Sequence, residues 1–313
     1  MFNRNTFATH RRYITPFSIA TAAVLAVAFT FVVSCTLVGC NLKGGGTVGS
    51  NSDSLTYKTL SIDSTYEQAH QKICLLVVTG GNRDAAKRIN DSLAADIGLQ
   101  AGQSLSSLFK LDDNFIKTYA TELADEKKNN KKNGVVESEE YLSTANTAFG
   151  GESIDTVYVT LNRNGVFSVA HETHSPTIHM RGEWFVTYHN FESATGKELL
   201  LSDLFQPNYT AELTKIAERY FRKQFIVEVM GEKENAKLGE LGFSFDSGIE
   251  DTDGNTHFAL KNSFCLTPEG LRFTYNKFEV SDDATGGMPS FYIPYSELRG
   301  LAKAGSVLER LTK

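Results

Sequence analysis

The sequence predicts an α+β protein whose strands and helices are grouped in blocks. Apolar residues recur at helical spacing in two regions, near residues 85–123 and 213–221, and strand-like stretches fill the chain before, between and after them. Such blocks are typical of the α+β class. An apolar fraction of 41% and an aromatic fraction of 11% are enough to build hydrophobic cores, which excludes a disordered, collagenous or coiled-coil chain.

The chain begins with the pattern of an export signal. Residues 1–16 contain three arginines and no acid, and Phe17–Val38 carries no charge. The apolar run leads through small and apolar residues into Cys40, an ending that resembles the lipobox of bacterial lipoproteins. We therefore expect residues 1–39 to be a lipoprotein signal peptide and Cys40 to carry the acyl chains that anchor the protein to a membrane.

Two alternatives remain open for this segment. Cys35 is a second, weaker lipidation candidate, and an uncleaved run of about 22 apolar residues is long enough to span a bilayer. All three interpretations place the rest of the chain outside the cytoplasm, in the periplasm or at the cell surface.

The net charge of the exported part indicates which classes of partner it can bind. Removing residues 1–39 removes three arginines and no acids, so a net charge of −6 becomes −9. This balance argues against binding to nucleic acid and favours cationic partners. Solubility alone is the alternative explanation.

A tether and a first domain are expected next. Residues 40–54 are rich in Gly and Ser and predict a flexible tether. We expect a first α+β domain over residues 55–185. Its elements are strands at 55–62 and 72–79, a helix with the stripe Ala85, Ile89, Leu93 and Ile97 closed by Gly98, a helix from about residue 112 with the stripe Phe115, Tyr119 and Leu123, a charged loop at 127–134, and strands at 157–161, 166–174 and 184–191.

A second α+β domain is expected over residues 186–306. It would contain a turn at Thr195-Gly196, a helix over 213–221, strands at 257–266, 271–280 and 290–293, and a closing helix from Ser296.

Three segments resemble a known family. They are Thr195–Phe205 (TGKELLLSDLF), Phe264–Tyr275 (FCLTPEGLRFTY) and Phe291–Leu298 (FYIPYSEL). Together they resemble family 3298 of bacterial envelope domains of unknown function. Residues 55–185 resemble its usual companion, family 4163, which is found beside some peptidoglycan deacetylases.

The resemblance implies an envelope role and some candidate residues. One relative is an anti-sigma factor whose extracellular part binds lysozyme. The loop between the two halves keeps its histidine, His179, but here reads Pro-Thr-Ile-His without the usual glycines. The segment after residue 280 is more acidic than usual because it contains Asp282 and Asp283. We take His174, His179, Asp282 and Asp283 as candidates for partner binding.

Two cysteines remain in the exported part. Cys74 and Cys265 both lie in apolar runs. In an oxidising compartment they could form a disulfide, and two buried thiols are the alternative.

The densest ionisable cluster comprises His171, Glu172, His174, His179, Glu183 and His189. Imidazoles and a carboxylate suit zinc, but His171 and His174 would point to opposite faces of a strand. We expect no metal and no cofactor. The alternatives are a loop histidine bonded to backbone and a partner-binding surface.

Catalytic motifs fail on inspection. Residues 244–248 look like a deacetylase motif, but Ser247 stands where the metal-ligating Asp belongs, and the second motif lies upstream with altered spacing. Residues 251–255 do not form a complete calcium loop, since the Gly comes too early and no Glu follows at position twelve. We therefore expect a non-enzymatic envelope protein that binds a cationic, lysozyme-like protein or peptidoglycan. The alternatives are a cell-wall-modifying enzyme, an accessory to one, and a purely structural lipoprotein.

Overall fold

The computed structural model describes residues 54–66, 69–100, 103, 105–133, 151–177, 180–246, 256–281 and 288–313. Cys40, His179, Asp282 and Asp283 lie outside these ranges, as does the expected signal peptide. Within the described ranges, no helix has both the length and the apolar character that crossing a membrane requires.

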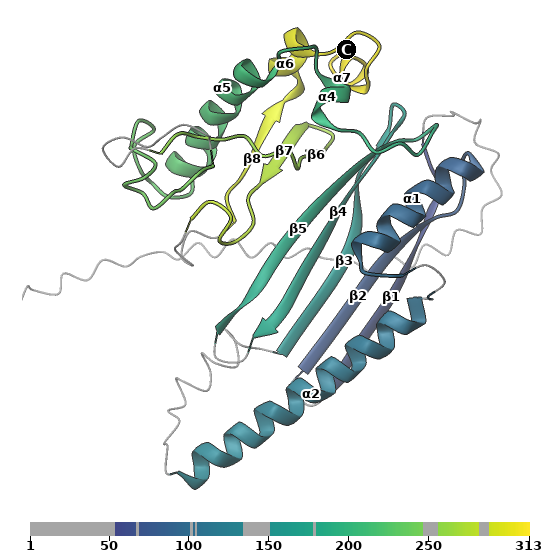
Figure 1. Cartoon of the computed structure of the whole chain (residues 1–313), viewed down its shortest axis with the longest axis vertical. Coiled ribbons are helices and arrows are strands. Elements are labelled where there is room, and N and C mark those ends of the chain that lie inside the picture. Colours follow the sequence, from purple (N-terminus) through teal and green to yellow (C-terminus); the bar gives the residue numbers. More distant parts are fainter. Residues whose placement is uncertain are drawn as a thin grey trace, which may run out of the picture. The chain divides into compact units, whose positions relative to one another are not determined.

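The larger sheet has five strands in the order β1-β2-β3-β4-β5 (Figure 1). They are β1 (Tyr57–Tyr66), β2 (Ala69–Val78), β3 (Gly151–Arg163), β4 (Val166–Thr177) and β5 (Met180–Glu192). β2 and β3 pair in parallel, and the other neighbours are antiparallel. Asn164 and Gly165 join β3 to β4 with φ of 54° and 76°, which confirms the predicted hairpin turn, because these residues tolerate positive φ.

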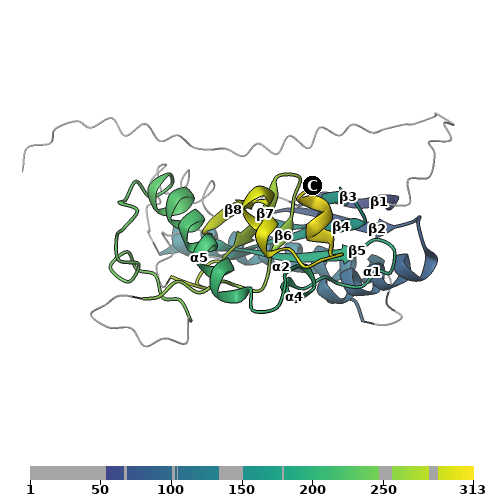
Figure 2. The ribbon, with the colours of Figure 1, turned by 90° about the horizontal axis from the view of Figure 1, so that it is seen from above.

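Helix α1 (Arg83–Asp96) packs on one face of this sheet (Figure 2). It begins where the Asn82 side chain accepts hydrogen bonds from the N–H groups of Asp84 and Ala85, at 2.9 and 3.1 Å. Gly98 follows its end with φ of 78°. The buried residues of its predicted stripe are Ala85, Ile89 and Leu93; the last two join a core with Val157, Phe167 and Val169 of the sheet.

Helix α2 (Leu105–Lys132) contacts β1, β2 and β3 and is longer than the sequence suggested. It starts before residue 112 and includes residues 127–132, so the charged loop predicted there is wrong. Lys, Glu and Ala are strong helix formers, and the helix dipole favours lysines in a last turn. A run of charges therefore extends this helix.

The smaller sheet has the order β6-β7-β8 and consists of β6 (Cys265–Leu266), β7 (Gly270–Thr274) and β8 (Ser290–Pro294). Helix α5 (Thr210–Phe221) continues into a π-helical turn, η1 (Arg222–Val227), and packs on β8. Phe221 lies at the centre of an aromatic core that includes Phe243, Phe258 and Phe291. Short helices complete this part: α4 (Leu201–Leu204), α6 (Tyr295–Leu298), η3 (Arg299–Leu301) and α7 (Val307–Leu311).

Two predicted strands are shorter than expected. Only Cys265–Leu266 of the strand predicted at 257–266 is paired, and the strand predicted at 271–280 ends at Thr274. Turns occupy residues 277–279, and Phe278 has φ of 64°. Alternating apolar residues there pack into the core without forming a ladder.

The two sheets meet through β6, which contacts β3, β4 and β5. The Asn190 amide of β5 donates to Phe264 O at 2.7 Å and accepts from Leu266 N at 2.9 Å. β5 belongs to the larger sheet as far as Glu192, so a domain boundary between residues 185 and 186 would cut a strand.

Four amide side chains each pair with the backbone of a residue in a strand or, for Leu55, just before one. Each one both accepts from the N–H and donates to the C=O of the same residue. The pairs are Asn90 with Val78, Asn162 with Leu55, Gln224 with Tyr292, and Asn276 with Val186. An amide side chain offers the same donor and acceptor as a peptide unit, so each substitutes locally for a missing neighbouring strand.

Cys74 and Cys265 both lie in the described part of the chain, and both are thiols, with no disulfide between them. Cys74 aligns with Thr156 and then Glu172 across the sheet, whereas Cys265 lies against Ser168, 3.8 Å from its Oγ. Two strand spacings and four residues amount to about 16 Å, well beyond the roughly 7 Å limit between bridged Cα atoms. This corrects the disulfide prediction in favour of the alternative of two thiols.

Candidate functional site

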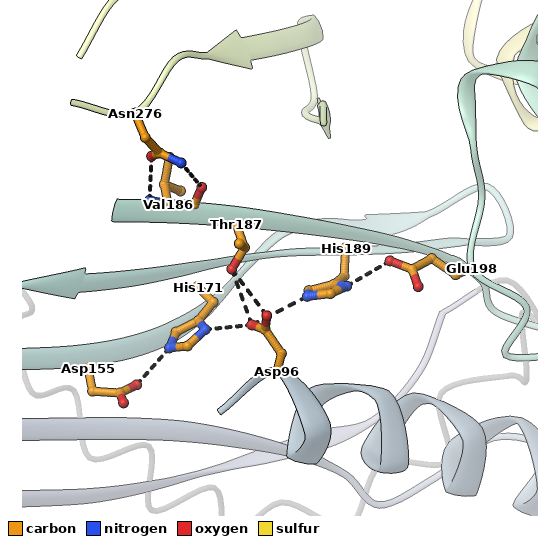
Figure 3. A network of polar contacts seen from close by, with 8 residues as sticks. All are labelled: Asp96, Asp155, His171, Val186, Thr187, His189, Glu198 and Asn276. Carbon is orange, nitrogen blue, oxygen red and sulfur yellow. Dashed lines mark hydrogen bonds and ion pairs between the residues drawn. The ribbon is translucent and has the colours of Figure 1, made fainter. Parts of the chain in front are cut away.

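A chain of five ionisable side chains crosses the face of the larger sheet that α1 covers (Figure 3). Carboxylates and imidazoles alternate along it in the order Asp155, His171, Asp96, His189 and Glu198. The five residues come from β3, β4, the end of α1, β5 and the segment after β5. We call them the His–carboxylate network.

Strand register brings the strand members together. His171 lies opposite Thr187, and Val169 lies opposite His189. Asp155 lies two residues before Val157, the partner of His171 on β3. Because side chains alternate between faces, these polar groups share the face whose apolar residues pack on α1.

Both nitrogens of each imidazole meet a carboxylate. His171 donates from Nδ1 to Asp96 Oδ2 at 2.5 Å and from Nε2 to Asp155 Oδ1 at 2.8 Å. His189 donates from Nδ1 to Glu198 Oε1 at 2.7 Å, and its Nε2 lies 3.3 Å from Asp96 Oδ2. With both nitrogens donating to carboxylates, the His171 ring is an imidazolium. His189 forms one hydrogen bond, to Glu198, and an ion pair with Asp96.

The pKa values follow from these contacts. Burial alone would lower the pKa of both imidazoles, but hydrogen bonds to Asp155 and Asp96 raise that of His171 to about 9, and bonds to Asp96 and Glu198 raise that of His189 to about 9. Burial alone would raise the pKa of Asp96, but the bonds from the two imidazoles outweigh it and hold this pKa well below its ordinary value.

The network also resolves an unfavourable position for Asp96. A carboxylate at the C-terminal end of a helix faces the negative end of the helix dipole, and α1 has no basic residue in its last turn. His171 and His189 supply the missing positive charge. Thr187 adds a hydrogen bond from Oγ1 to Asp96 Oδ2 at 3.2 Å. The arrangement therefore fastens the end of α1 to β3, β4 and β5.

The contacts of the His–carboxylate network suit a structural role better than a catalytic one. An imidazole that acts as a general base or a metal ligand needs a nitrogen with an available lone pair. Both nitrogens of His171 and Nδ1 of His189 are hydrogen-bonded to carboxylates, and Nε2 of His189 faces the Asp96 carboxylate at 3.3 Å. Thr187 Oγ1 points to a carboxylate, not to an imidazole that could activate it as a nucleophile. Among the residues described, no group of three or more His, Cys, Asp or Glu side chains could hold a metal ion.

A comparison with known protein families matches part of the chain to one family model. Residues 202–296 match the family model described as "Protein of unknown function (DUF3298)". This DUF3298 segment spans most of α4 through the start of α6. No curated protein matches the chain.

Two crystal structures of DUF3298 proteins share the fold. One, from Bacteroides fragilis, has a TM-score of 0.59 at 15% identity and covers 84% of this chain and 99% of its own. The other, from Pseudomonas aeruginosa, has a TM-score of 0.50 at 14% identity and covers 82% of this chain and 97% of its own. The α+β class is confirmed, and the likeness extends well beyond the DUF3298 segment.

The predicted candidates are separated by the fold. His171 and His189 of the histidine-rich cluster meet in the network, but His174 lies on the opposite face, stacked on Trp184 with ring centroids 4.3 Å apart. Glu172 shares that opposite face and accepts a hydrogen bond from Tyr158 Oη at 2.6 Å. His179, Asp282 and Asp283 lie outside the described residues.

Asp96 and Asp155 were not singled out from the sequence. The spacing of α1 contained a signal, because Asp96 continues the buried stripe of Ile89 and Leu93 by one helical step of three residues. A carboxylate on an apolar stripe at a helix end requires a cationic partner.

Proposed function

We propose that this chain is a lipid-anchored protein of the bacterial cell envelope that binds a partner outside the cytoplasm and is not an enzyme. The arginine-containing N-terminus, the uncharged run and Cys40 support export and lipidation. The DUF3298 segment agrees with the envelope family that the sequence resembles. A family 4163-like domain, expected over residues 55–185, is part of this proposal, with its end moved to the end of β5 at Glu192.

The observation that carries the binding function is that three exposed aromatic side chains lie on β5, an edge strand of the larger sheet, and in the turn bonded to it. Trp184 and Phe185 are consecutive in β5 and so point to opposite faces of the sheet. Trp184, Phe185 and Phe278 are 39%, 42% and 54% exposed. The Asn276 amide brings the turn that holds Phe278 to β5: its Oδ1 accepts from Val186 N at 2.8 Å, and its Nδ2 donates to Val186 O at 3.2 Å (Figure 3). We call Trp184, Phe185 and Phe278 the aromatic edge.

Neighbouring side chains hold the aromatic edge in place. His174 stacks on Trp184 with an interplanar angle of 16°, and Lys277 Nζ lies 4.8 Å from the Phe278 ring centroid. Aromatic residues dominate the binding energy of many interfaces, and side chains already ordered lose less entropy on binding. The predicted candidate His174 thus supports this role by orienting Trp184.

The charge balance indicates what kind of partner fits. A mature charge of −9 speeds the approach of a basic protein, and the exposed ring faces can receive its Arg and Lys side chains. A lysozyme-like protein is therefore the first candidate, and peptidoglycan is the second. A cell-wall-modifying enzyme remains the alternative, but both imidazoles of the His–carboxylate network are engaged by carboxylates.

A pull-down from envelope extract with the full-length chain, at low and physiological salt, tests the proposal. We expect a basic protein that is retained at low salt, is partly released at higher salt, and is lost with the Trp184→Ala/Phe185→Ala double variant. Tyr57→Ala is the matched control, since Tyr57 is 42% exposed at the opposite edge strand, β1. Equal capture by the double variant, or turnover of peptidoglycan by the purified chain, would contradict the proposal.

A further inference from the structure

Arg272 of β7 is half-buried on the side of the smaller sheet that faces away from its core. Its neighbours Leu271 and Phe273 are fully buried in that core, so strand alternation directs Arg272 to the other side. Its Nε donates to Ser290 Oγ at 3.1 Å, and its guanidinium carbon lies 5.6 Å from the Tyr292 ring centroid.

The side chains around Arg272 form a polar layer between the two sheets. The guanidinium is charged because the ordinary pKa of arginine lies far above neutral pH. Burial alone would lower the pKa of Arg272, but the nearby groups Tyr188, Tyr292 and Tyr158 raise it. Tyr188 Oη lies 2.8 Å from Thr274 Oγ1, a contact that joins β5 to β7. Hydroxyl groups and ring faces therefore surround this cation.

No negative charge in the described part of the chain balances Arg272. Its contacts there are the Ser290 hydroxyl and the Tyr292 ring, so both Nη nitrogens lack a protein acceptor. The Glu172 carboxylate accepts from Tyr158, one of the phenols near Arg272, and forms no ion pair with Arg272. A partly desolvated charge without a partner is costly, and the planar fork of two Nη groups fits a carboxylate with two parallel hydrogen bonds.

We propose that Arg272 binds the carboxylate of a sugar acid, with the Tyr292 ring packing against the sugar. Tyr292 is 38% exposed, which leaves a ring face for a saccharide. Glu172 and Tyr158 offer an acceptor and a hydroxyl for the sugar's own hydroxyl groups. One positive charge matches a monoanion. The inference rests on the proposed envelope function and names as the ligand class a wall glycan whose N-acetylmuramic acid has a free lactyl carboxylate, that is, glycan without its stem peptides.

Calorimetric titration of the full-length chain tests this site with four probes: N-acetylmuramic acid, N-acetylglucosamine, D-lactate and inorganic phosphate. We expect N-acetylmuramic acid to bind more tightly than N-acetylglucosamine, which lacks the carboxylate, and than D-lactate, which lacks the ring. Arg272→Gln should weaken its binding by about tenfold or more, because a charge-assisted bidentate contact is lost. Arg88→Gln is the matched control, since Arg88 is exposed and its one side-chain hydrogen bond within the described residues is to Thr195 O.

Two further observations keep the test decisive. Tyr292→Ala retains the backbone bonds of residue 292 to Gln224, so the fold should persist while affinity falls a few-fold. Equal affinity for the two sugars, preferred binding of phosphate, or unchanged binding by a folded Arg272→Gln variant would overturn the proposal. A protein partner captured through the aromatic edge without any sugar binding would leave the proposed function standing and reject this site alone.

Discussion

The carboxylate of Asp96 lies 2.5 Å from Nδ1 of His171, although 75 residues separate the two in the chain. This contact fixes the last turn of α1 against β4. It also makes the stability of the helix–sheet packing depend on two charged imidazoles.

Asp96→Asn should destabilise the protein strongly. The substitution leaves His171 and His189 without their shared counter-ion in a partly buried site, and we expect a loss of about 2–4 kcal/mol in the free energy of unfolding. Urea denaturation followed by circular dichroism measures it. Asp91→Asn in the same helix is the control, because its pair with Lys87 is exposed, and it should change stability by less than about 0.5 kcal/mol. Equal effects of the two substitutions would show that the network contributes little.

Stability should fall at alkaline pH. His171 and His189 have pKa values of about 9 in the folded protein against an ordinary value of 6.5. Between these values the folded state keeps protons that the unfolded state releases. The contribution is therefore complete below about pH 6.5 and is lost as the pH rises through about 9.

At acid pH the stability should change in the opposite direction, falling as the pH falls. The lowered pKa of Asp96 gives stability above its ordinary value of 3.8, and this is lost as the pH falls further. Urea midpoints from about pH 2 to 9.5 should show both slopes, and His189→Gln should reduce the alkaline one. A flat profile between pH 6.5 and 9 in the unsubstituted chain is the result that contradicts this.

Gly196→Ala should separate the turn after β5 from α1. Gly196 has φ of 68°, and a Cβ placed on it would lie 2.5 Å from Ala85 O and 2.8 Å from Ala85 Cα. We expect a cost of about 2–4 kcal/mol, because backbone must move. Gly98→Ala is the control: φ is 78° there but nothing lies within 4 Å of the added atom, so only the backbone strain of about 1–2 kcal/mol applies. Thermal melting ranks the two variants.

Asn276→Ala should expose the edge of β5. Loss of both bonds to Val186 should cost about 1–2 kcal/mol and leave strand backbone open to a second molecule. We expect more dimer and higher oligomer in light-scattering chromatography. Asn276→Asp keeps the acceptor for Val186 N–H and loses the donor. Its stability and its tendency to associate should therefore lie between those of the unsubstituted chain and those of Asn276→Ala. A monomeric Asn276→Ala variant would assign the amide a purely local role.

Cys265 should resist thiol reagents until the protein unfolds. It is fully buried, and burial raises the pKa of its thiol. Maleimide labelling with mass mapping should therefore modify Cys265 only in denaturant. A reducing agent should not change the melting temperature, since Cys74 and Cys265 are not bridged. A lower melting temperature on reduction would instead support a disulfide between them.

The local sequence pattern was sufficient to predict the elements whose apolar residues recur regularly or whose turn residues are distinctive. The stripe of Ala85, Ile89 and Leu93 predicted α1, and Asn164-Gly165 predicted the β3–β4 hairpin, because both signals depend on residues close in sequence. The strand expected at 257–266 was mostly wrong, because an alternating pattern does not specify whether a neighbouring strand is available to pair.

The network was only half predictable for the same reason. Histidine spacing pointed to His171 and His189, but strand alternation places His174 on the other face, where it stacks on Trp184. Asp155 reaches His171 through the β3–β4 hairpin, but Asp96 reaches it only because β2 and β3 pair in parallel after a long excursion of the chain. No short-range signal specifies that pairing.

This parallel pairing has a kinetic consequence. β3, β4 and β5 are joined by short turns and can assemble early, as can the β1–β2 hairpin, whereas β2 reaches β3 only after α1 and α2 have been traversed. Loop closure over such a distance slows folding. The order of assembly should therefore be two preformed pieces of sheet that dock late, with the Asp96–His171 contact as the mark that docking is complete.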